Sequence, residues 1–337
     1  MKLLFITQKI HQKDDDLAFV ILWIKEFIRQ GAEVEVICLE KREFDDSFPV
    51  HSLGKEKGFG KLSQVLEFWK LIFTLKYDRV FVHMNAEYMT LGGWYWFLRG
   101  IPTYLWFTHY VTHIHLKLAG FFCQRLFAAT SQSLPQYEGN PKKIITGHGI
   151  DTDFWMSAAI LGGVNNNDEH HLCSIHRLCR SKRLELGIRA LKNLPADYNL
   201  TVYGRDVEKD YYQEILALIK KEHLEERAIL KGPVAMENLK NIYSQFRLMV
   251  NMASETIDKT MLEAMLFGIY PITTPANSRA IGLPIWPLGE TPADLAKFIL
   301  DGEWKKYSQE YLQNIVKEKH SLSSLIAKMN VYIKSGS

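Results

Sequence analysis

The sequence predicts an α/β protein built from two doubly wound domains, and three observations lead to this expectation. Apolar strands alternate with amphipathic helices through the first half, a rhythm that implies a parallel sheet covered on both faces. The same alternation returns in the second half, after a small and polar segment at residues 161–168. At 337 residues the chain is long enough for two domains that each bury a core.

In the first half, the spacing of apolar residues decides each element. Residues 17–29 carry apolar side chains on one helical stripe, and residues 34–38 form a short apolar run typical of a buried strand. By the same reasoning we expect strands at 2–7, 34–38, 79–83, 104–108 and 126–129, and helices at 17–29 and 62–75.

The second half follows the same rules. Residues 171–176 are a strand by their apolar content, and a helix follows at 184–194. We expect further strand segments at 200–203, 229–234, 246–252 and 269–273, and helices at 237–246, 261–266, 295–300, 305–317 and 322–334.

One stretch, residues 246–273, reads as a strand, a turn, a helix and a strand. Glu255 falls in the turn, Glu263 lies inside the helix, and Gly268 stands where a helix needs a left-handed cap. The first N–H groups of a helix have no partner within it, so a phosphorylated ligand could lie over Lys259 and Thr260.

The alternative is an ordinary capped helix, with Thr256 or Asp258 as its N-cap and Glu263 in solvent. The wider pattern favours the ligand site. Glu255 and Glu263, followed by Ala-Met-x-x-Gly, resemble the Glu-x7-Glu signature of retaining glycosyltransferases of family 4. That resemblance covers nearly the whole chain, points to a bacterial branch, and implies the GT-B fold, in which two Rossmann-like domains face a central cleft.

A basic loop follows the strand at 171–176. Arg177 and Lys182 match the family pattern Gly-Arg-x-x-x-x-Lys, with His176 in the place of the glycine. By resemblance these two cations grip the nucleotide diphosphate, which gains negative charge as the glycosidic bond breaks. Without that resemblance, the loop reads equally well as a solvated basic face.

The same letters allow a metal site, since they include several nitrogen and sulfur ligands. Neighbouring side chains of a strand point to opposite faces, however, and no second pair of ligands follows at zinc-finger spacing. We therefore expect no metal, although a structural zinc site remains the rival interpretation of His170, His171, Cys173, His176 and Cys179.

Other site residues come from the resemblance. His109 follows an apolar strand at the place where the family has a histidine beside the donor sugar. Gly204 corresponds to the first glycine of the family's Ile-Val-Gly-x-Gly strand end, while Asp206 replaces the second. Val234 lies in the segment that borders the nucleobase. Together with Arg177, Lys182, Lys259, Thr260, Glu255 and Glu263, these residues form the expected site.

The resemblance also sets the domain boundaries. Residues 142–154 resemble the family's seam between domains, where Gly147 and Gly149 allow a sharp hinge. We expect an N-terminal acceptor-side domain at 1–160, rejoined by the C-terminal helix at about 318–337, and a domain for the nucleotide sugar at 161–317.

The expected activity is transfer of a hexosyl unit from a UDP- or GDP-linked sugar to a cell-envelope glycan or lipid-linked acceptor. No cofactor is expected, because the nucleotide sugar is a substrate and no Gly-x-Gly-x-x-Gly follows the first strand. The alternatives are a sugar-nucleotide epimerase or hydrolase on the same fold, and a non-catalytic protein that binds nucleotide sugars.

Bulk properties narrow the partners. The net charge of +3 is too small to imply nucleic acid, and the four cysteines form no disulfide framework. Because Met1 leads directly into a strand, we expect a cytoplasmic protein. Lysines mixed with aromatic residues at 55–77 and 94–97 leave two readings open: a peripheral contact at the inner face of the plasma membrane, or a core-facing helix with solvated lysines.

Overall fold

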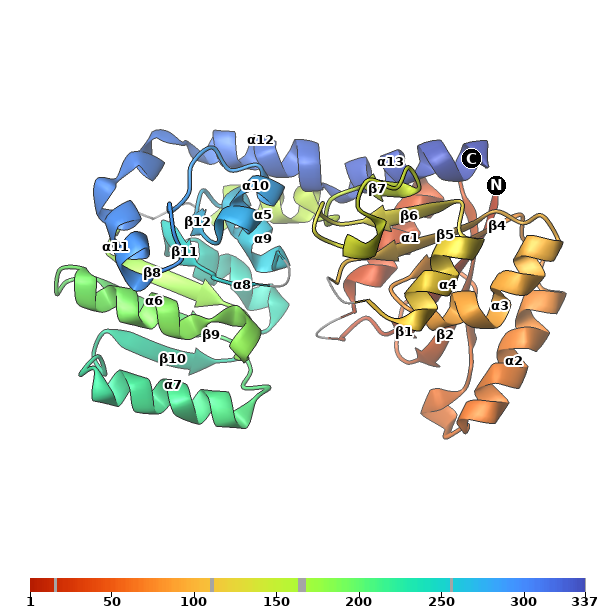
Figure 1. Ribbon diagram of the computed structural model, residues 1–337, viewed down its shortest axis with the longest axis horizontal. Helices are drawn as coiled ribbons and strands as arrows, with labels where there is room; N and C mark the ends of the chain where they lie inside the picture. The colour runs from red at the N-terminus through yellow and green to blue at the C-terminus, as the bar shows by residue number, and fades with distance from the viewer. Residues whose placement is uncertain (15–16, 110–111, 163–167, 255–256, 337) are drawn as a thin grey trace. The chain divides into compact units, whose positions relative to one another are not determined.

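The computed structural model describes residues 1–14, 17–109, 112–162, 168–254 and 257–336. Its contacts divide the chain into two compact units (Figure 1). Unit 1 comprises Met1–Gly149 and Leu322–Ser337, and unit 2 comprises Ile150–Ser321. Each unit holds a parallel sheet with interleaved helices, which confirms the predicted α/β fold class with two doubly wound domains.

Unit 1 contains a seven-stranded sheet in the order β3-β2-β1-β4-β5-β6-β7, and every neighbouring pair is parallel. The order runs outward from β1 in both directions, as in doubly wound proteins. The strands are β1 (Lys2–Ile10), β2 (Glu33–Lys41), β3 (Val50–Ser52), β4 (Arg79–His83), β5 (Thr103–Phe107), β6 (Arg125–Ala128) and β7 (Lys143–Ile145).

Helices cover both faces of this sheet because strand side chains alternate between the faces. Leu3 and Phe5 of β1 pack in one core cluster, and Leu4 and Ile6 pack in another. The first cluster includes helices α1 (Phe19–Arg29) and α13 (Leu322–Ser335), and the second includes α2 (Lys61–Thr74), α3 (Glu87–Leu98) and α4 (Ile114–Phe122).

Unit 2 contains a five-stranded parallel sheet in the order β10-β9-β8-β11-β12. Its strands are β8 (His171–Ile175), β9 (Asn199–Tyr203), β10 (Ala228–Gly232), β11 (Leu248–Val250) and β12 (Tyr270–Ile272). Its helices are α5 (Thr152–Gly162), α6 (Leu184–Ala190), α7 (Lys209–Lys221), α8 (Met236–Tyr243), α9 (Lys259–Leu266), α10 (Pro275–Ile281), α11 (Pro292–Asp301) and α12 (Gln309–His320).

The boundary between the units lies elsewhere than at the expected residues 160 and 317. Residues 150–160 belong to unit 2 because Trp155 is 1% exposed and packs its ring 5.7 Å from Tyr243 and 6.2 Å from Phe267. Helix α5, which carries Trp155, was not anticipated from the sequence. Gly149 just before it has φ +69°, and a Cβ there would lie 3.0 Å from the Trp23 indole.

Residues 163–167, the centre of the expected linker, lie outside the described part of the chain. In the part that is described, none of the helices combines the length and the apolar character needed to cross a bilayer.

Candidate functional site

The candidate site of unit 2 begins where strand β11 ends. In a parallel sheet all strands present their carboxyl ends at one edge, where α/β proteins bind ligands. Asn251 follows β11, is fully buried, and is the first polar residue after the apolar strand. Helix α9 then begins at Lys259, with Asp258 at its N-cap position. The predicted residues Glu255 and Thr256 lie outside the described residues.

Helix α9 itself follows the sequence pattern. Five of its eight residues are buried, on the stripe that the spacing predicted: Met261, Leu262, Ala264, Met265 and Leu266. Gly268 just beyond the helix has φ +81°, the left-handed conformation that its position indicated. The stripe anchors the helix in the core of unit 2, so its first residues point their N–H groups out of that core.

A buried ion pair lies at the start of α9. The Lys182 ammonium is 2.5 Å from Oδ1 of Asp258, and the Asn251 amide donates a 2.8 Å hydrogen bond to Oδ2. The Lys182 side chain is 5% exposed and that of Asp258 is 18% exposed. Both charges therefore interact in surroundings of low polarity, where an unpaired ion would be costly.

A second pair lies one turn further along the helix. Glu263 is half-buried rather than in solvent, and it accepts a 3.0 Å hydrogen bond from the Tyr243 hydroxyl at the end of α8. Burial raises the pKa of the Glu263 carboxyl to about 7, although Tyr243 and Lys259 both favour its charged form. Burial also lowers the pKa of the Lys259 ammonium to about 7.

These two shifts have a chemical consequence. Near neutral pH, Glu263 and Lys259 each exchange protons readily, so a ligand can select their charge states at low free-energy cost. A bound anion favours the charged lysine, and a pair of ligand hydroxyls favours the carboxylate. Strongly shifted groups of this kind mark functional sites more often than structural ones.

Two other predicted residues have structural roles on the same edge. The Thr260 hydroxyl donates a 2.7 Å hydrogen bond to the carbonyl of Ile175, which ties α9 to the end of β8. A Cβ at Gly204 would lie only 1.8 Å from the carbonyl oxygen of His176, so glycine is required there by the neighbouring strand end. Both residues therefore shape the edge whether or not they contact a ligand.

The predicted cation pair is not symmetrical. Lys182 is buried beside Asp258, whereas the Arg177 side chain is exposed. Between them, His176 is buried and donates a 2.9 Å hydrogen bond from Nδ1 to the Arg177 carbonyl, with Nε2 2.8 Å from the Ser174 hydroxyl. Burial lowers the pKa of His176. Only Lys182 is thus held in place by tertiary contacts.

Val234 lies between β10 and α8, where it is half-buried and packs against the core of unit 2. Its side chain therefore stabilises this loop, and any ligand contact would fall to the backbone.

The residues suggested as zinc ligands each have a different partner. The side chain of His170 contacts Asp197, His171 contacts Thr201, and Cys179 contacts Ser181. Cys173 lies 3.6 Å from the Leu248 carbonyl. Within the described ranges, no three His, Cys, Asp or Glu side chains are grouped so as to hold a metal ion.

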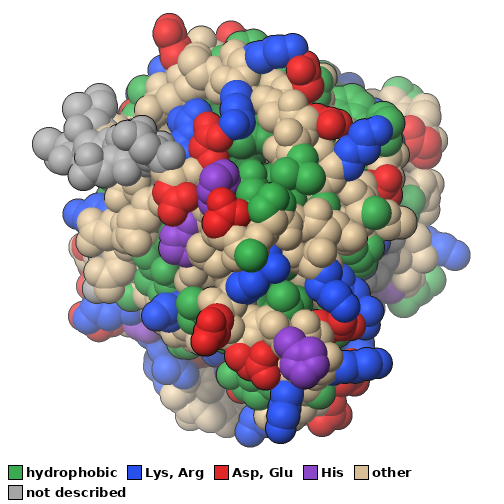
Figure 2. All heavy atoms as spheres, turned by 90° about the vertical axis from the view of Figure 1, so that its left-hand side faces the viewer, with side chains coloured by type: hydrophobic (Ala, Val, Ile, Leu, Met, Phe, Trp, Pro, Cys, Tyr) green, Lys and Arg blue, Asp and Glu red, His purple; other side chains and the backbone are tan. Residues whose placement is uncertain are grey.

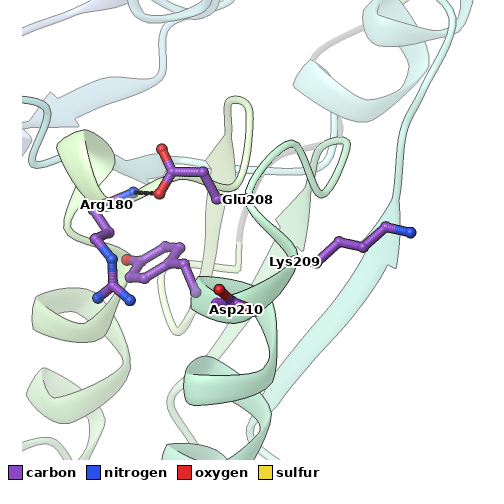
Figure 3. Close-up of a pocket in the computed structure, with 5 residues that line it drawn as sticks. Arg180, Glu208, Lys209 and Asp210 are labelled. Carbon is purple, nitrogen blue, oxygen red and sulfur yellow. Dashed lines mark hydrogen bonds between the residues drawn. The ribbon is translucent and has the colours of Figure 1, made fainter.

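A hollow of about 250 Å³ lies beside the same loop but has a different character (Figure 3). Its lining includes Glu208 and Asp210, and its one arginine, Arg180, forms a two-point ion pair with Glu214. The Arg180 backbone N–H donates a 3.2 Å hydrogen bond to Glu208. Carboxylates oppose the binding of a diphosphate, so we place the ligand site at Lys182 and not here.

Basic and acidic side chains are intermixed over the face shown in Figure 2. Such a surface has no extended field of one sign to attract a polyanion.

In unit 1, His109 follows β5 and is exposed, and its ring packs edge-on against Phe107 at 5.7 Å. The preceding strand end has a different histidine environment. His83 is 1% exposed and its ring lies 5.3 Å from those of Trp23 and Trp106. The structure thus presents His109 to solvent, whereas it encloses His83 among aromatic rings.

Sequence reasoning missed three residues of the site in unit 2: Asn251, Asp258 as an ion-pair partner, and Tyr243. Asn251 carried a signal, because a polar residue directly after an apolar strand marks the carboxyl edge of the sheet. Tyr243 lies 20 residues before Glu263 and carried none.

Known families match both units. The family described as "Glycosyl transferase 4-like" matches residues 12–132, within unit 1, and the family "Glycosyl transferases group 1" matches residues 162–280, within unit 2. A comparison with curated protein sequences finds no match.

Solved structures share the whole fold. HepE from Anabaena in complex with UDP is 18% identical with a TM-score of 0.78, and covers 99% of this chain and 100% of its own. A glycosyltransferase from Rickettsia africae is 13% identical with a TM-score of 0.77, over 99% of this chain and 98% of its own. Sucrose-phosphate synthase from Thermosynechococcus elongatus is 14% identical with a TM-score of 0.71, over the same shares.

At such low identity these likenesses concern the fold. They agree with the two family matches, which fall on separate units of the chain. The chain therefore belongs to the GT-B superfamily of glycosyltransferases.

Proposed function

We propose that the protein is a retaining, metal-independent glycosyltransferase that moves a hexosyl unit from a UDP- or GDP-linked sugar to a cell-envelope glycan or lipid-linked acceptor. The observation that carries this proposal is the Lys182 ammonium, held in a buried position at the start of α9 by Asp258 and Asn251. The structures of HepE with UDP and with UDP-glucose support a nucleotide-sugar donor.

In this proposal the diphosphate binds to Lys182, Arg177 and the N-terminal end of α9, with Lys259 adding positive charge. Glu263 accepts hydrogen bonds from the ribose hydroxyls, and Glu255 accepts them from the sugar. His109 contributes a contact to the sugar. Thr260, Gly204 and Val234 border the donor through their backbone.

The Lys182–Asp258 pair implies a competition. Without ligand, the Asp258 carboxylate neutralises the ammonium, so an incoming diphosphate oxygen replaces a carboxylate oxygen as its partner. Replacing one anion by another keeps the buried lysine paired throughout, which avoids the cost of an isolated charge. Asn251 retains Asp258 while the exchange takes place.

The reaction breaks the bond between the anomeric carbon and the leaving phosphate oxygen and forms a bond from the same carbon to the acceptor oxygen. Attack from the face that the phosphate leaves explains retention of configuration. The acceptor proton passes to the leaving phosphate oxygen. Lys182 and Arg177 stabilise the charge on the diphosphate as it grows, so the protein's own cations supply the work that a divalent metal does elsewhere.

We also propose a cytoplasmic location. All four cysteines of the chain are unpaired and buried, as suits a compartment that keeps thiols reduced. A nucleotide-sugar donor fits this location, and neither a cofactor nor nucleic acid has a part in the proposal.

The test has two steps. First, thermal shifts are measured with UDP, GDP and their hexose conjugates, for which a ligand at about a hundred times its dissociation constant adds roughly 2.7 kcal/mol. Wild type is expected to shift, and Glu263→Ala is not. An equal shift in both proteins would overturn the assignment of the site.

Second, the ligand that shifts the protein is incubated with extracted envelope glycans and lipids, in EDTA, and the anomeric configuration of the product is read by NMR. Transfer with retention is expected. Turnover of the donor without any acceptor would instead indicate an epimerase or hydrolase, and binding without turnover would indicate a non-catalytic protein.

A further inference from the structure

Unit 1 carries an exposed apolar surface on three neighbouring helices, which we call the α2–α4 surface. Helices α2, α3 and α4 lie side by side over one face of the sheet, in orange to yellow (Figure 1). The large side chains exposed there include Leu98 at 75%, Leu62 at 73% and Phe121 at 65%. The full set is Phe59, Leu62, Leu66 and Phe73 at and before α2, Trp94, Phe97 and Leu98 on α3, and Ile114 and Phe121 on α4.

Ring contacts show that this surface is continuous from helix to helix. Phe73 of α2 packs 4.8 Å from Tyr95 and 6.4 Å from Trp94 of α3. On the next helix, Phe97 packs 5.8 Å from Phe121 of α4. Trp94 and Phe97 are three residues apart on one helix face, so the aromatic rings form a band across all three helices.

Helix α3 is unusual for a helix at a protein surface. It has no charged residue after Glu87, and its apolar side chains surround the whole helix. Two glycines allow close packing beneath it, since a Cβ at Gly93 would lie 2.5 Å from Phe122 of α4. A helix that is apolar on all sides is normally buried, so the outer side of α3 calls for a covering layer.

The charges around this surface have one sign. Residues 88–122 contain no Asp or Glu. Arg99 and Lys117 are exposed within that range, and Lys61, Lys70 and Lys76 are exposed along α2. Long basic side chains can lay their stems on apolar surface and hold their charges in water, where anionic headgroups lie. The indole N–H of Trp94 already donates to the Leu91 carbonyl at 3.0 Å, so its ring can enter an apolar phase without losing a partner.

We propose that the α2–α4 surface binds the surface of a lipid bilayer that contains anionic headgroups, with the aromatic band at the level of the headgroups and the basic residues around it. A bilayer fits better than a second protein because the surface joins three parallel requirements: exposed aromatic rings, aliphatic side chains and positive charge without acidic partners over 88–122. The proposal does not depend on the donor site of unit 2.

The test uses the full chain and flotation with two kinds of vesicle, pure phosphatidylcholine and phosphatidylcholine with phosphatidylglycerol. Wild type is expected to float with the anionic vesicles and to be released by high salt. The double variant Phe97→Ser/Leu98→Ser is expected to bind at least tenfold more weakly, and Lys61→Gln/Lys117→Gln to lose binding to the anionic vesicles selectively. Leu288→Ser, a change at a 92% exposed leucine of unit 2, is the matched control and is expected to bind as wild type does.

Three results would overturn the proposal. One is that wild type floats with neither kind of vesicle. Another is that Phe97→Ser/Leu98→Ser binds as well as wild type while keeping its circular dichroism and melting temperature. The third is that the wild type is a dimer by light scattering and the double variant a monomer, without any vesicle binding, because a second copy would then cover the surface.

Discussion

The two units share a parallel doubly wound sheet, yet the carboxyl ends of their strands have been put to different uses. In unit 1, β4 ends in His83, whose ring stacks on Trp106 at 5.3 Å with an interplanar angle of 6°. In unit 2, β11 leads into Asn251, which holds Asp258 against the buried Lys182. The same edge of the same fold is filled by aromatic packing in one unit and by charge in the other, so position in a fold does not by itself identify a site.

The largest effect expected from this difference is at Lys182. Lys182→Ala should lower kcat/KM about 10³-fold, equivalent to about 4 kcal/mol of transition-state stabilisation, since the diphosphate loses its buried cation. Arg180→Ala is the matched control in the same turn. Its guanidinium is already bound to Glu214 on the surface, so activity should stay within about threefold of wild type. Equal losses in both variants would show that the burial of Lys182 does not matter.

Asp258 tests whether the charge cluster is a structural ion pair or an exchangeable one. Asp258→Asn leaves the Lys182 ammonium buried without a carboxylate, so the free energy of unfolding without ligand should fall by about 3 kcal/mol. Nucleoside diphosphate should restore the lost stability, which gives a larger thermal shift than in wild type. Denaturant titrations with and without ligand measure both quantities. A smaller shift than in wild type would contradict the exchange and assign Asp258 to donor binding.

Glu263 should show an effect of opposite sign on stability. Its pKa is about 7 in the folded chain against an ordinary 4.5, so the folded state binds the extra proton between these values. Stability from this group is therefore present below pH 4.5 and is lost as the pH rises through 7. At pH 8, Glu263→Gln should be more stable than wild type by on the order of 2 kcal/mol, allowing for partial exposure, while its nucleotide binding is lost.

The pH profile supplies the control. Lys259 shifts in the other direction, from 10.5 to about 7, so its contribution to stability increases as the pH rises from 7 towards 10.5. Urea titrations from pH 5 to 10 should show both limbs in wild type and only the rising limb in Glu263→Gln. A variant that is less stable than wild type at pH 8 would show that Glu263 is a structural residue.

The smallest effect is expected at the corresponding edge of unit 1. His83→Phe keeps a flat ring among the rings of Trp23 and Trp106, so the unfolding free energy should change by about 1 kcal/mol or less. The nucleotide-induced thermal shift should be unchanged. A lost shift in this variant would place the histidine in the ligand site and remove the contrast between the units.

Local patterns predicted the elements of the fold well, because each strand and helix shows its burial in its own sequence. The stripe of α9 and the left-handed Gly268 were predicted from spacing alone. Helix α5 was missed, since the role of Trp155 depends on Tyr243 and Phe267, more than 80 residues away along the chain.

For the site, the sequence by itself determined which segments carry phosphate-binding chemistry: the basic loop at 177–182 and the turn before α9. The tertiary structure decided which of their charges are buried and which side chains they meet. Lys182 and Asp258 are 76 positions apart, and Tyr243 and Glu263 are 20 apart, so no local pattern links them. Burial depends on the packing of several elements at once, and burial is what gives Lys182, Lys259 and Glu263 their properties.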